Sequence, residues 1–283
     1  IVSLLVQSLY NIVDSIFVAK MSEEALTATS LAFPVQMLMI AFSVGTSVGV
    51  NALLSKTLGA RNRERATKIA NTSIMLALIN GAVFSLTGIF FAQKLARSFT
   101  TVESTAALCA EYLSICMVFC FGNFIETMLQ RFLQAAGNTV LSMCSLIAGA
   151  VTNIMLDPIL IFGLLGFPAL GIRGAAIATV IGQWLGAAVA LLLNRFCNRE
   201  VIVDFRRFCP EKEIIFGIYK VGLPNIITQA ISSVMVTLVN QILMPLSMSA
   251  VAFFGVYYKL QTFIYLPANG IVQGMRPLIG YNY

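Results

Sequence analysis

The sequence is dominated by apolar stretches that are long enough to cross a lipid bilayer. A transmembrane helix needs about 20 apolar residues. The chain is 58% apolar and only 11% charged, whereas soluble domains are about 45–50% apolar and about 25% charged. The sequence therefore predicts an all-α, polytopic membrane helical bundle. Eight candidate spans can be drawn, at residues 1–19, 26–55, 69–95, 108–133, 140–163, 172–195, 214–243 and 249–279.

Lysine and arginine gather in alternate connections between these spans. The connections after the second and sixth spans each hold five basic residues, and Arg131 lies near the connection between the fourth and fifth spans. The other connections hold Lys20, the pair Lys94 and Arg97, Arg173, or no basic residue. Because cytoplasmic connections are enriched in lysine and arginine, we expect a multi-pass protein of the cell inner (plasma) membrane with both ends of this chain in the cytoplasm.

The net charge of +6 does not indicate a nucleic-acid partner, because the basic residues are scattered over short connections and form no stripe. The six cysteines form no Cys-x-x-Cys pair, and the chain has no histidine. A zinc site needs further ligands of these kinds, so we expect no metal site built on cysteine. We also expect no cofactor, and a monomer in contact with the bilayer.

The long polar break between the sixth and seventh spans predicts a boundary between two lobes. We expect an N-lobe at 1–197, a cytoplasmic inter-lobe loop at 198–213 and the start of a C-lobe at 214–283. A weak internal repeat supports this division and is typical of transporters. We therefore expect four further helices after Tyr283 and, because Ile1 already lies in an apolar run, a fragment. The repeat equates Val13-Asp14 with Val239-Asn240, Ala25-Leu26 with Ala250-Val251, and Gly45 and Gly49 with Gly270 and Gly274, at an offset of 225 or 226 residues.

Asp157 is the only ionisable residue between positions 141 and 165. A charged side chain at membrane depth costs at least roughly 2.5–3.5 kcal/mol, so it is by default a candidate for function. Asn153 lies one helical turn earlier, on the same face. Pro158 frees a backbone carbonyl one turn back, and an opened helix beside an acid can form an ion site. The alternative is that Asp157 begins an outward loop.

A second acid, Asp14, shares one face of the first span with Gln7 and Tyr10, at spacings of three and four residues. The amide and the hydroxyl can supply oxygen ligands to a cation, whereas burial favours proton uptake by the acid. The residues leave both options open, as well as a solvated Asp14 at the outer end of its helix. We expect Asp14 and Asp157 to meet and bind a cation.

The sixth span begins with small residues that favour close helix packing. Its Thr179 carries a hydroxyl that a neighbouring helix could use, or that bonds its own backbone instead. Glu126 and Arg131 in the fourth span are candidates for a gate or a substrate path, with an interfacial ion pair as the alternative. Lys259 and Gln261 in the last span are further candidates for that path; Lys259 could instead snorkel to the interface.

Several of these stretches together resemble the multidrug and toxic compound extrusion (MATE) transporters. The last span is most similar to the MepA-like bacterial branch of that family, and the resemblance covers essentially the whole chain. It is carried by YNIVDSIFV at 10–18, NIMLDP at 153–158, GAAIAT at 174–179, GVYYKLQ at 255–261 and QGMRP at 273–277.

The resemblance implies a fold of twelve helices in two lobes, of which this chain holds the six-helix N-lobe and the first two helices of the C-lobe. It also implies export of cationic or amphipathic drugs in exchange for Na⁺ or H⁺, and no enzymatic activity. The C-lobe acid of NorM-type members has no counterpart, because Ser232 and Ser233 occupy its region. Coupling is therefore expected through the N-lobe site of DinF-type members, which matches Gln7, Tyr10, Asp14, Asn153, Asp157 and Thr179 here, with Na⁺ an option at Asp14, Asn153 and Asp157.

Two other functions are weighed against drug antiport. A flippase for lipid-linked precursors is expected to have a groove rich in arginine, whereas arginine lies mainly in the connections here. An intramembrane aspartyl protease uses two acids that share one proton. Neither Asp14 nor Asp157 follows a tyrosine or lies in a Gly-x-Gly-Asp run, which that chemistry would suggest. Both alternatives are therefore the weaker expectations.

Overall fold

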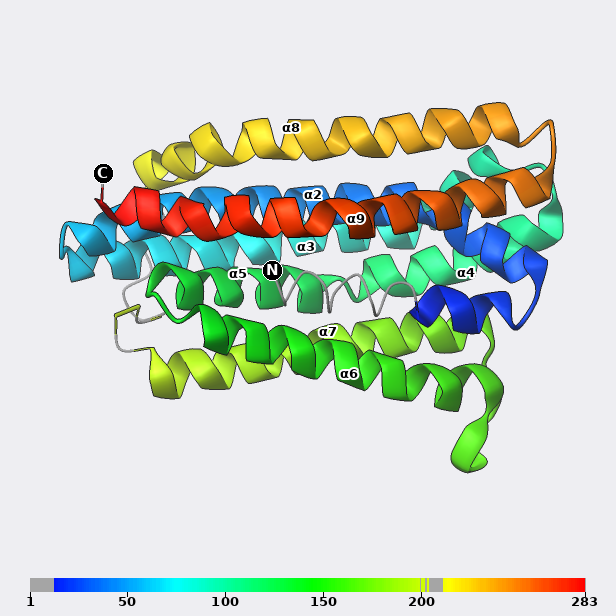
Figure 1. Ribbon diagram of the computed structural model, residues 1–283, viewed down its shortest axis with the longest axis horizontal. Coiled ribbons are helices and arrows are strands. Elements are labelled where there is room, and N and C mark those ends of the chain that lie inside the picture. Colours follow the sequence, from blue (N-terminus) through cyan, green and yellow to red (C-terminus); the bar gives the residue numbers. More distant parts are fainter. Residues whose placement is uncertain (1–12, 199, 202, 204–210, 283) are drawn as a thin grey trace.

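The computed structural model describes residues 13–198, 200, 201, 203 and 211–282. Every regular element within these residues is helical (Figure 1). The predicted all-α bundle is thus confirmed. Residues 13–19 are helical and are followed by α2 (Glu23–Gly59), α3 (Arg63–Phe99), α4 (Glu103–Val118), α5 (Phe121–Ala135), α6 (Thr139–Phe162), the short 3-10 helix η1 (Leu164–Gly166), α7 (Ile172–Cys197), α8 (Lys212–Leu243) and α9 (Met248–Asn282).

Helices α2, α3, α6, α7 and α8 are each long and apolar enough to cross a membrane. The fourth predicted span, 108–133, is not one straight helix, because α4 and α5 meet at a bend of 46°. Two side-chain hydrogen bonds join this break to α3, and one of them satisfies a carbonyl at the end of α4. Ser85 of α3 donates to the carbonyl of Val118 at 3.0 Å, and the Cys120 thiol donates to the carbonyl of Gly81 at 3.4 Å.

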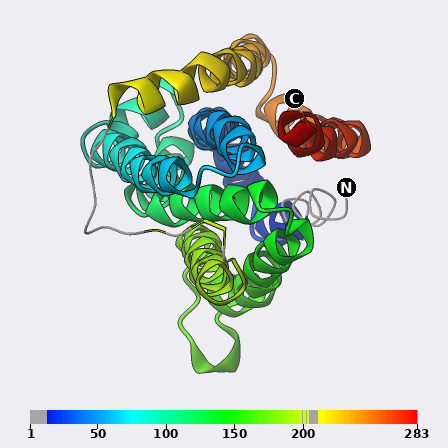
Figure 2. The ribbon, with the colours of Figure 1, turned by 90° about the vertical axis from the view of Figure 1, so that its left-hand side faces the viewer.

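The bundle has two ends that differ in the connections they carry. We call the end with connections 60–62, 136–138 and 198–211 the basic end, and the end with 163–171 and 244–247 the opposite end. Figure 2 looks onto the basic end. In this view α5 crosses the middle of the N-lobe, with α2 and α3 on one side and α6 and α7 on the other. Any side chain buried on α5 therefore lies between these two helix pairs.

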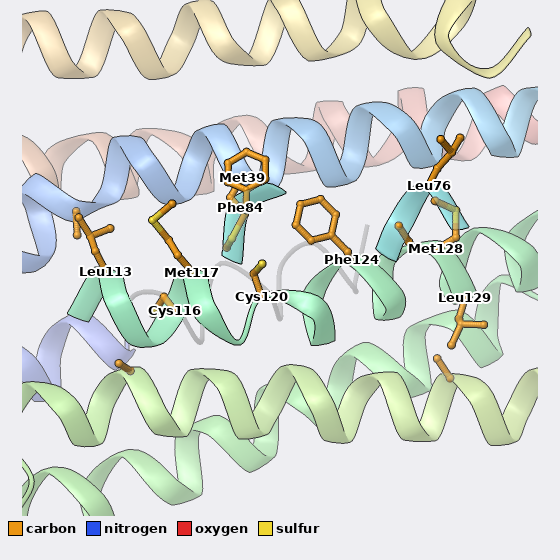
Figure 3. Close-up of a cluster of buried hydrophobic side chains, with 14 of the residues drawn as sticks. Met39, Leu76, Phe84, Leu113, Cys116, Met117, Cys120, Phe124, Met128 and Leu129 are labelled. Carbon is orange, nitrogen blue, oxygen red and sulfur yellow. The ribbon is translucent and has the colours of Figure 1, made fainter. Parts of the chain in front are cut away.

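Aromatic and sulfur side chains fill the interior between α2, α3, α4 and α5 (Figure 3). The ring of Phe84 packs against Phe42 at 5.4 Å and against Phe124 at 5.8 Å, measured between ring centroids. Met117 and Met128 are buried beside them. These side chains form an apolar part of the interior.

Helices α6 and α7 approach each other closely through glycines. A Cβ atom on Gly149 would lie 2.9 Å from the carbonyl oxygen of Gly182, and one on Gly182 would lie 2.8 Å from that of Gly149. Small residues allow this approach, as the sequence predicts for the sixth span. The close packing brings Asn153 on α6 next to Thr179 on α7.

Helix α2 also packs against α8 and α9. Helix α8 follows α2 in the antiparallel direction, with Gly222 against Gly45 and the Ser233 hydroxyl donating to the carbonyl of Pro34 at 2.5 Å. Ser233, which occupies the region of the NorM-type acid, thus makes a packing contact here. Pro34 lies inside a continuous α2, and Pro224 lies inside a continuous α8.

Helix α9 packs against α2 in a parallel direction, and the residues that touch are those that the internal repeat equates. Ser30 lies against Gly255, the rings of Phe33 and Tyr258 pack at 6.2 Å, and the Ser249 hydroxyl donates to the Glu23 carboxylate. Each pair is separated by 225 or 226 residues, the offset read from the sequence. This pattern is that of a two-fold axis between α2 and α9, running along the helices.

Candidate cation site

The central acid of the site lies inside a helix and away from solvent. Helix α6 continues through Pro158 to Phe162, so Asp157 does not begin an outward loop as the alternative interpretation held. The Asp157 side chain is fully buried, and that of Asn153 is buried one turn earlier. Pro158 has no N–H to donate to the carbonyl of Ile154. An acid, an amide and a backbone carbonyl that lacks its helical N–H donor therefore lie close together in α6.

The Asn153 amide connects this acid to α7. Its Nδ2 donates to Asp157 Oδ1 at 3.4 Å and to Thr179 Oγ1 at 3.4 Å. Thr179 in turn donates its hydroxyl to the carbonyl of Ala175 at 3.0 Å. Both interpretations of Thr179 are therefore realised together, because the hydroxyl bonds its own backbone while its oxygen faces α6.

Two oxygen atoms of this cluster are buried and have no hydrogen-bond partner within the described part of the chain. They are Asp157 Oδ2 and Asn153 Oδ1. A buried polar atom without a partner is unfavourable, and such groups in a native fold call for an explanation such as a bound ion. Carboxylate and amide oxygens are suitable ligands for a hard cation, and the carboxylate can also accept a proton.

Asp14 lies in the helical residues 13–19, and its charge acts on Asp157. It also acts on Tyr112 and Cys116 of α4. The two acids predicted from the sequence therefore share one region between the first helix, α4 and α6. Gln7 and Tyr10, the other predicted members from the first span, lie outside the described residues.

Three polar residues at the border of this region were not singled out from the sequence. Gln36 of α2 donates its Nε2 to the Tyr112 hydroxyl at 3.2 Å and lies 3.8 Å from the Cys116 sulfur. Tyr112 and Cys116 are both buried and stand one turn apart on α4. Their spacing of four residues in an apolar span was the available signal, but tyrosine and cysteine count as apolar in a hydropathy pattern.

The candidates for a gate or substrate path lie elsewhere. Glu126 accepts a hydrogen bond from Gln130 Nε2 at 3.0 Å, and it forms no ion pair with any described residue. Arg131 is buried and donates to Ser47 at 3.3 Å and to Gln134 at 2.7 Å. Gln261 is partly buried on α9, whereas the Lys259 side chain lies outside the described set.

Comparison with known proteins agrees with this architecture. The multidrug export protein MepA of Staphylococcus haemolyticus (strain JCSC1435) is 26% identical over 280 residues, which cover 99% of this chain and 61% of that protein. MepA of Staphylococcus aureus (strain bovine RF122 / ET3-1) is 27% identical with the same coverage. The chain thus spans about three fifths of the length of these relatives.

Solved structures match over nearly the whole chain. The MATE multidrug transporter DinF-BH in complex with rhodamine 6G superimposes with a TM-score of 0.93, at 26% identity, and the match covers 99% of this chain and 63% of that one. The inward-facing conformation of a MATE family transporter of the MOP superfamily matches with a TM-score of 0.83, at 29% identity, covering 97% of this chain and 60% of that one. The family model described as MatE matches residues 1–159, more than half of the sequence, and the chain therefore belongs to the MatE family.

Proposed function

We propose that the chain is the N-lobe and the start of the C-lobe of a secondary active antiporter, which exports cationic or amphipathic drugs in exchange for Na⁺ or H⁺. The observation that carries this proposal is the cluster of the partly buried Asp14 with the buried Asn153 and Asp157, in which two oxygen atoms lack partners among the described residues. The relatives named multidrug export proteins and the transporter solved with rhodamine 6G support a drug as cargo, and support a transporter over an enzyme.

In this proposal the cation neutralises the repulsion between the two acids. Without a cation, the negative charge of the buried Asp157 and the nearby charge of Asp14 destabilise the arrangement in which the first helix lies against α4 and α6. A proton or Na⁺ at Asp157 removes that repulsion, so that the first helix, which holds Asp14, can pack against α6, which holds Asp157. Coupling then requires only that the cation and the drug favour different arrangements of the lobe, each through its own difference in affinity.

Residues of α6 and α7 around the two acids fix the geometry of the site. Asn153 fixes the orientation of the Asp157 carboxylate and ties it to α7 through Thr179. The Gly149–Gly182 contact keeps α6 and α7 close enough for these hydrogen bonds. We infer that α6 and α7 form the rigid half of the site, while the first helix, which contributes Asp14, is the part that responds to the cation.

The test is drug efflux from vesicles that hold the full-length parent protein, under separately imposed Na⁺ and pH gradients. Asp157→Asn keeps the shape of the side chain and removes its charge. We expect gradient-driven export to fall at least about tenfold, which corresponds to about 1.4 kcal/mol of lost coupling. Glu103→Gln is the matched control, because Glu103 is an exposed acid paired with Arg97 outside the site. Full gradient-driven export by the Asp157 variant would show the proposed site to be wrong.

A further inference from the structure

A second acid lies in the interior of the N-lobe, apart from the Asp14–Asp157 cluster. Glu126 belongs to α5, the helix that crosses the middle of the lobe against α7 (Figure 2). Its side chain is partly buried, and a Cβ atom placed on Gly186 of α7 would overlap its carboxylate. The glycine at position 186 leaves room for the carboxylate in its present position, and a larger residue would displace it. The carboxylate is therefore seated directly on the backbone of α7.

One face of α7 connects this second acid to the cation site. Thr179, Gly182 and Gly186 follow each other at spacings of three and four residues, so they project from the same side of the helix. Thr179 accepts from Asn153, and a Cβ on Gly182 would lie 3.2 Å from Asn153 Cβ. Gly186 then meets Glu126. Seven residues of helix at 1.5 Å each place Glu126 about 10 Å farther toward the basic end than Thr179.

No positive charge on the surrounding helices lies at the level of Glu126. The nearest basic residue in the sequence, Arg131, is engaged by Ser47 and Gln134. Helix α6 carries no Lys, Arg, Asp or Glu other than Asp157, and α7 carries Arg173 and Arg195 only near its ends. The charged residues of α2 and α3 lie near the ends of these helices, and those of α4 are both acidic. They are Glu23, Glu24 and Lys56 on α2; Arg63, Glu64, Arg65, Lys68, Lys94 and Arg97 on α3; and Glu103 and Glu111 on α4.

The environment of Glu126 suits a proton better than a metal cation. Its described neighbour Gln130 turns its NH₂ group toward the carboxylate, whereas a bound cation needs oxygen atoms directed at it. Gly186 presents backbone at van der Waals distance on the other side. An unpaired negative charge at this depth is costly, and uptake of a proton removes that cost without any change in packing.

We propose that Glu126 is a second proton-carrying site of the N-lobe, which takes up the proton released from the Asp14–Asp157 cluster and passes it on toward the basic end. This inference rests on the proposed antiport. It adds the direction in which the proton moves and an intermediate site on its path. In the transfer, the O–H bond of the Asp157 carboxyl breaks and an O–H bond forms on the Glu126 carboxylate, so the charge moves from one acid to the other. The proton then leaves Glu126 for water at the basic end.

The decisive variant is Glu126→Gln, which keeps the size of the side chain and still presents an oxygen to Gln130. Two rates are measured in vesicles with the full-length protein, using rhodamine 6G as the probe. We expect export driven by a pH gradient to fall at least about fivefold. Exchange of labelled for unlabelled dye at equal pH needs no net proton movement, so we expect it to stay within about twofold of the unaltered protein.

Two further variants separate a proton-carrying role from a structural one. Glu126→Asp retains the acid and should recover most of the pH-driven export. Gly186→Ala retains the acid but displaces it, and should shift the pH of half-maximal export while preserving dye exchange. Equal loss of export and exchange in Glu126→Gln would show a structural role and overturn the inference.

Failure of the inference can be distinguished from failure of the antiport itself. If the unaltered protein responds to a pH gradient and Glu126→Gln responds equally, Glu126 carries no proton, while the antiport proposal stands. If the unaltered protein responds only to a Na⁺ gradient, the inference is likewise overturned, while the Asp157 site stands as a Na⁺ site. If it responds to neither gradient, both proposals are wrong.

Discussion

Asn153 is the residue on which the geometry of the cation site depends most directly. Its single amide nitrogen contacts both Asp157 and Thr179, and its carbonyl oxygen is left facing the site without a partner among the described residues. It therefore acts twice, as a donor that orients the carboxylate and as an oxygen atom that a cation can use. Removal of the side chain affects both roles, whereas a change at Thr179 affects only the orientation.

We predict that Asn153→Ala weakens binding of the coupling cation about tenfold. A hydrogen bond to a charged group contributes about 1.5–3 kcal/mol, and a tenfold change corresponds to about 1.4 kcal/mol. The measurement is the cation concentration, or the pH, that gives half-maximal drug export. Thr179→Val, which keeps the volume but removes the hydroxyl, should have a smaller effect in the same direction. A larger effect at Thr179 than at Asn153 would contradict this assignment of roles.

At the scale of helices, the break between α4 and α5 is held by α3. Ser85 supplies the donor that the Val118 carbonyl lacks after the bend, and Cys120 bonds back to Gly81 of the same helix. The bend in turn sets the direction of α5 and therefore the position of Glu126 against α7. A contact from a neighbouring helix thus determines the placement of a residue more than thirty positions away.

We predict that Ser85→Ala destabilises the protein by about 1 kcal/mol, because it removes a part-buried hydrogen bond to the Val118 carbonyl. The measurement is thermal or denaturant unfolding of the full-length protein in detergent. Ser98→Ala is the matched control, since Ser98 lies on the same helix, is exposed and bonds only to the carbonyl of Leu95 in its own helix. Equal stability of the two variants would mean that the bend does not depend on Ser85.

The same break marks a limit of what the sequence could predict. The helices agree with the apolar stretches because length and hydropathy decide whether a segment can span a bilayer. The bend at Phe119–Cys120 contains no proline, and its contacts with Ser85 and Gly81 come from another helix. Asp157 and Asn153 stood out as polar residues in an apolar run, whereas Tyr112 and Cys116 did not. Gln36 became relevant only when α2 and α4 were seen side by side.

Across the molecule as a whole, α2 contacts both α8 and α9, in two different ways. It runs antiparallel to α8 over most of its length, from Gly49 at Ile218 to Pro34 at Ser233. It meets α9 through residues that the internal repeat equates. The described side-chain contacts between α2 and α9 lie near the opposite end, where both helices begin. In Figure 2 the final turns of α9 stand apart from the N-lobe at the basic end. The contact of Ser30 with Gly255 therefore holds α2 and α9 together near the opposite end.

We predict that Gly255→Val forces this contact open. A Cβ atom at position 255 would lie 2.5 Å from the Ser30 hydroxyl oxygen, so α2 and α9 must separate near the axis that relates them. Spin labels at the beginnings of the two helices, in the full-length protein, should report a longer distance than in the unaltered protein. Ser30→Gly combined with Gly255→Val should restore part of the shorter distance, because it vacates the space that the new side chain needs. Gly217→Ala on α8 is the control, since its added methyl group meets only ordinary contact with Leu53. An unchanged label distance in Gly255→Val would mean that the spacing of α2 and α9 near the opposite end does not depend on this contact.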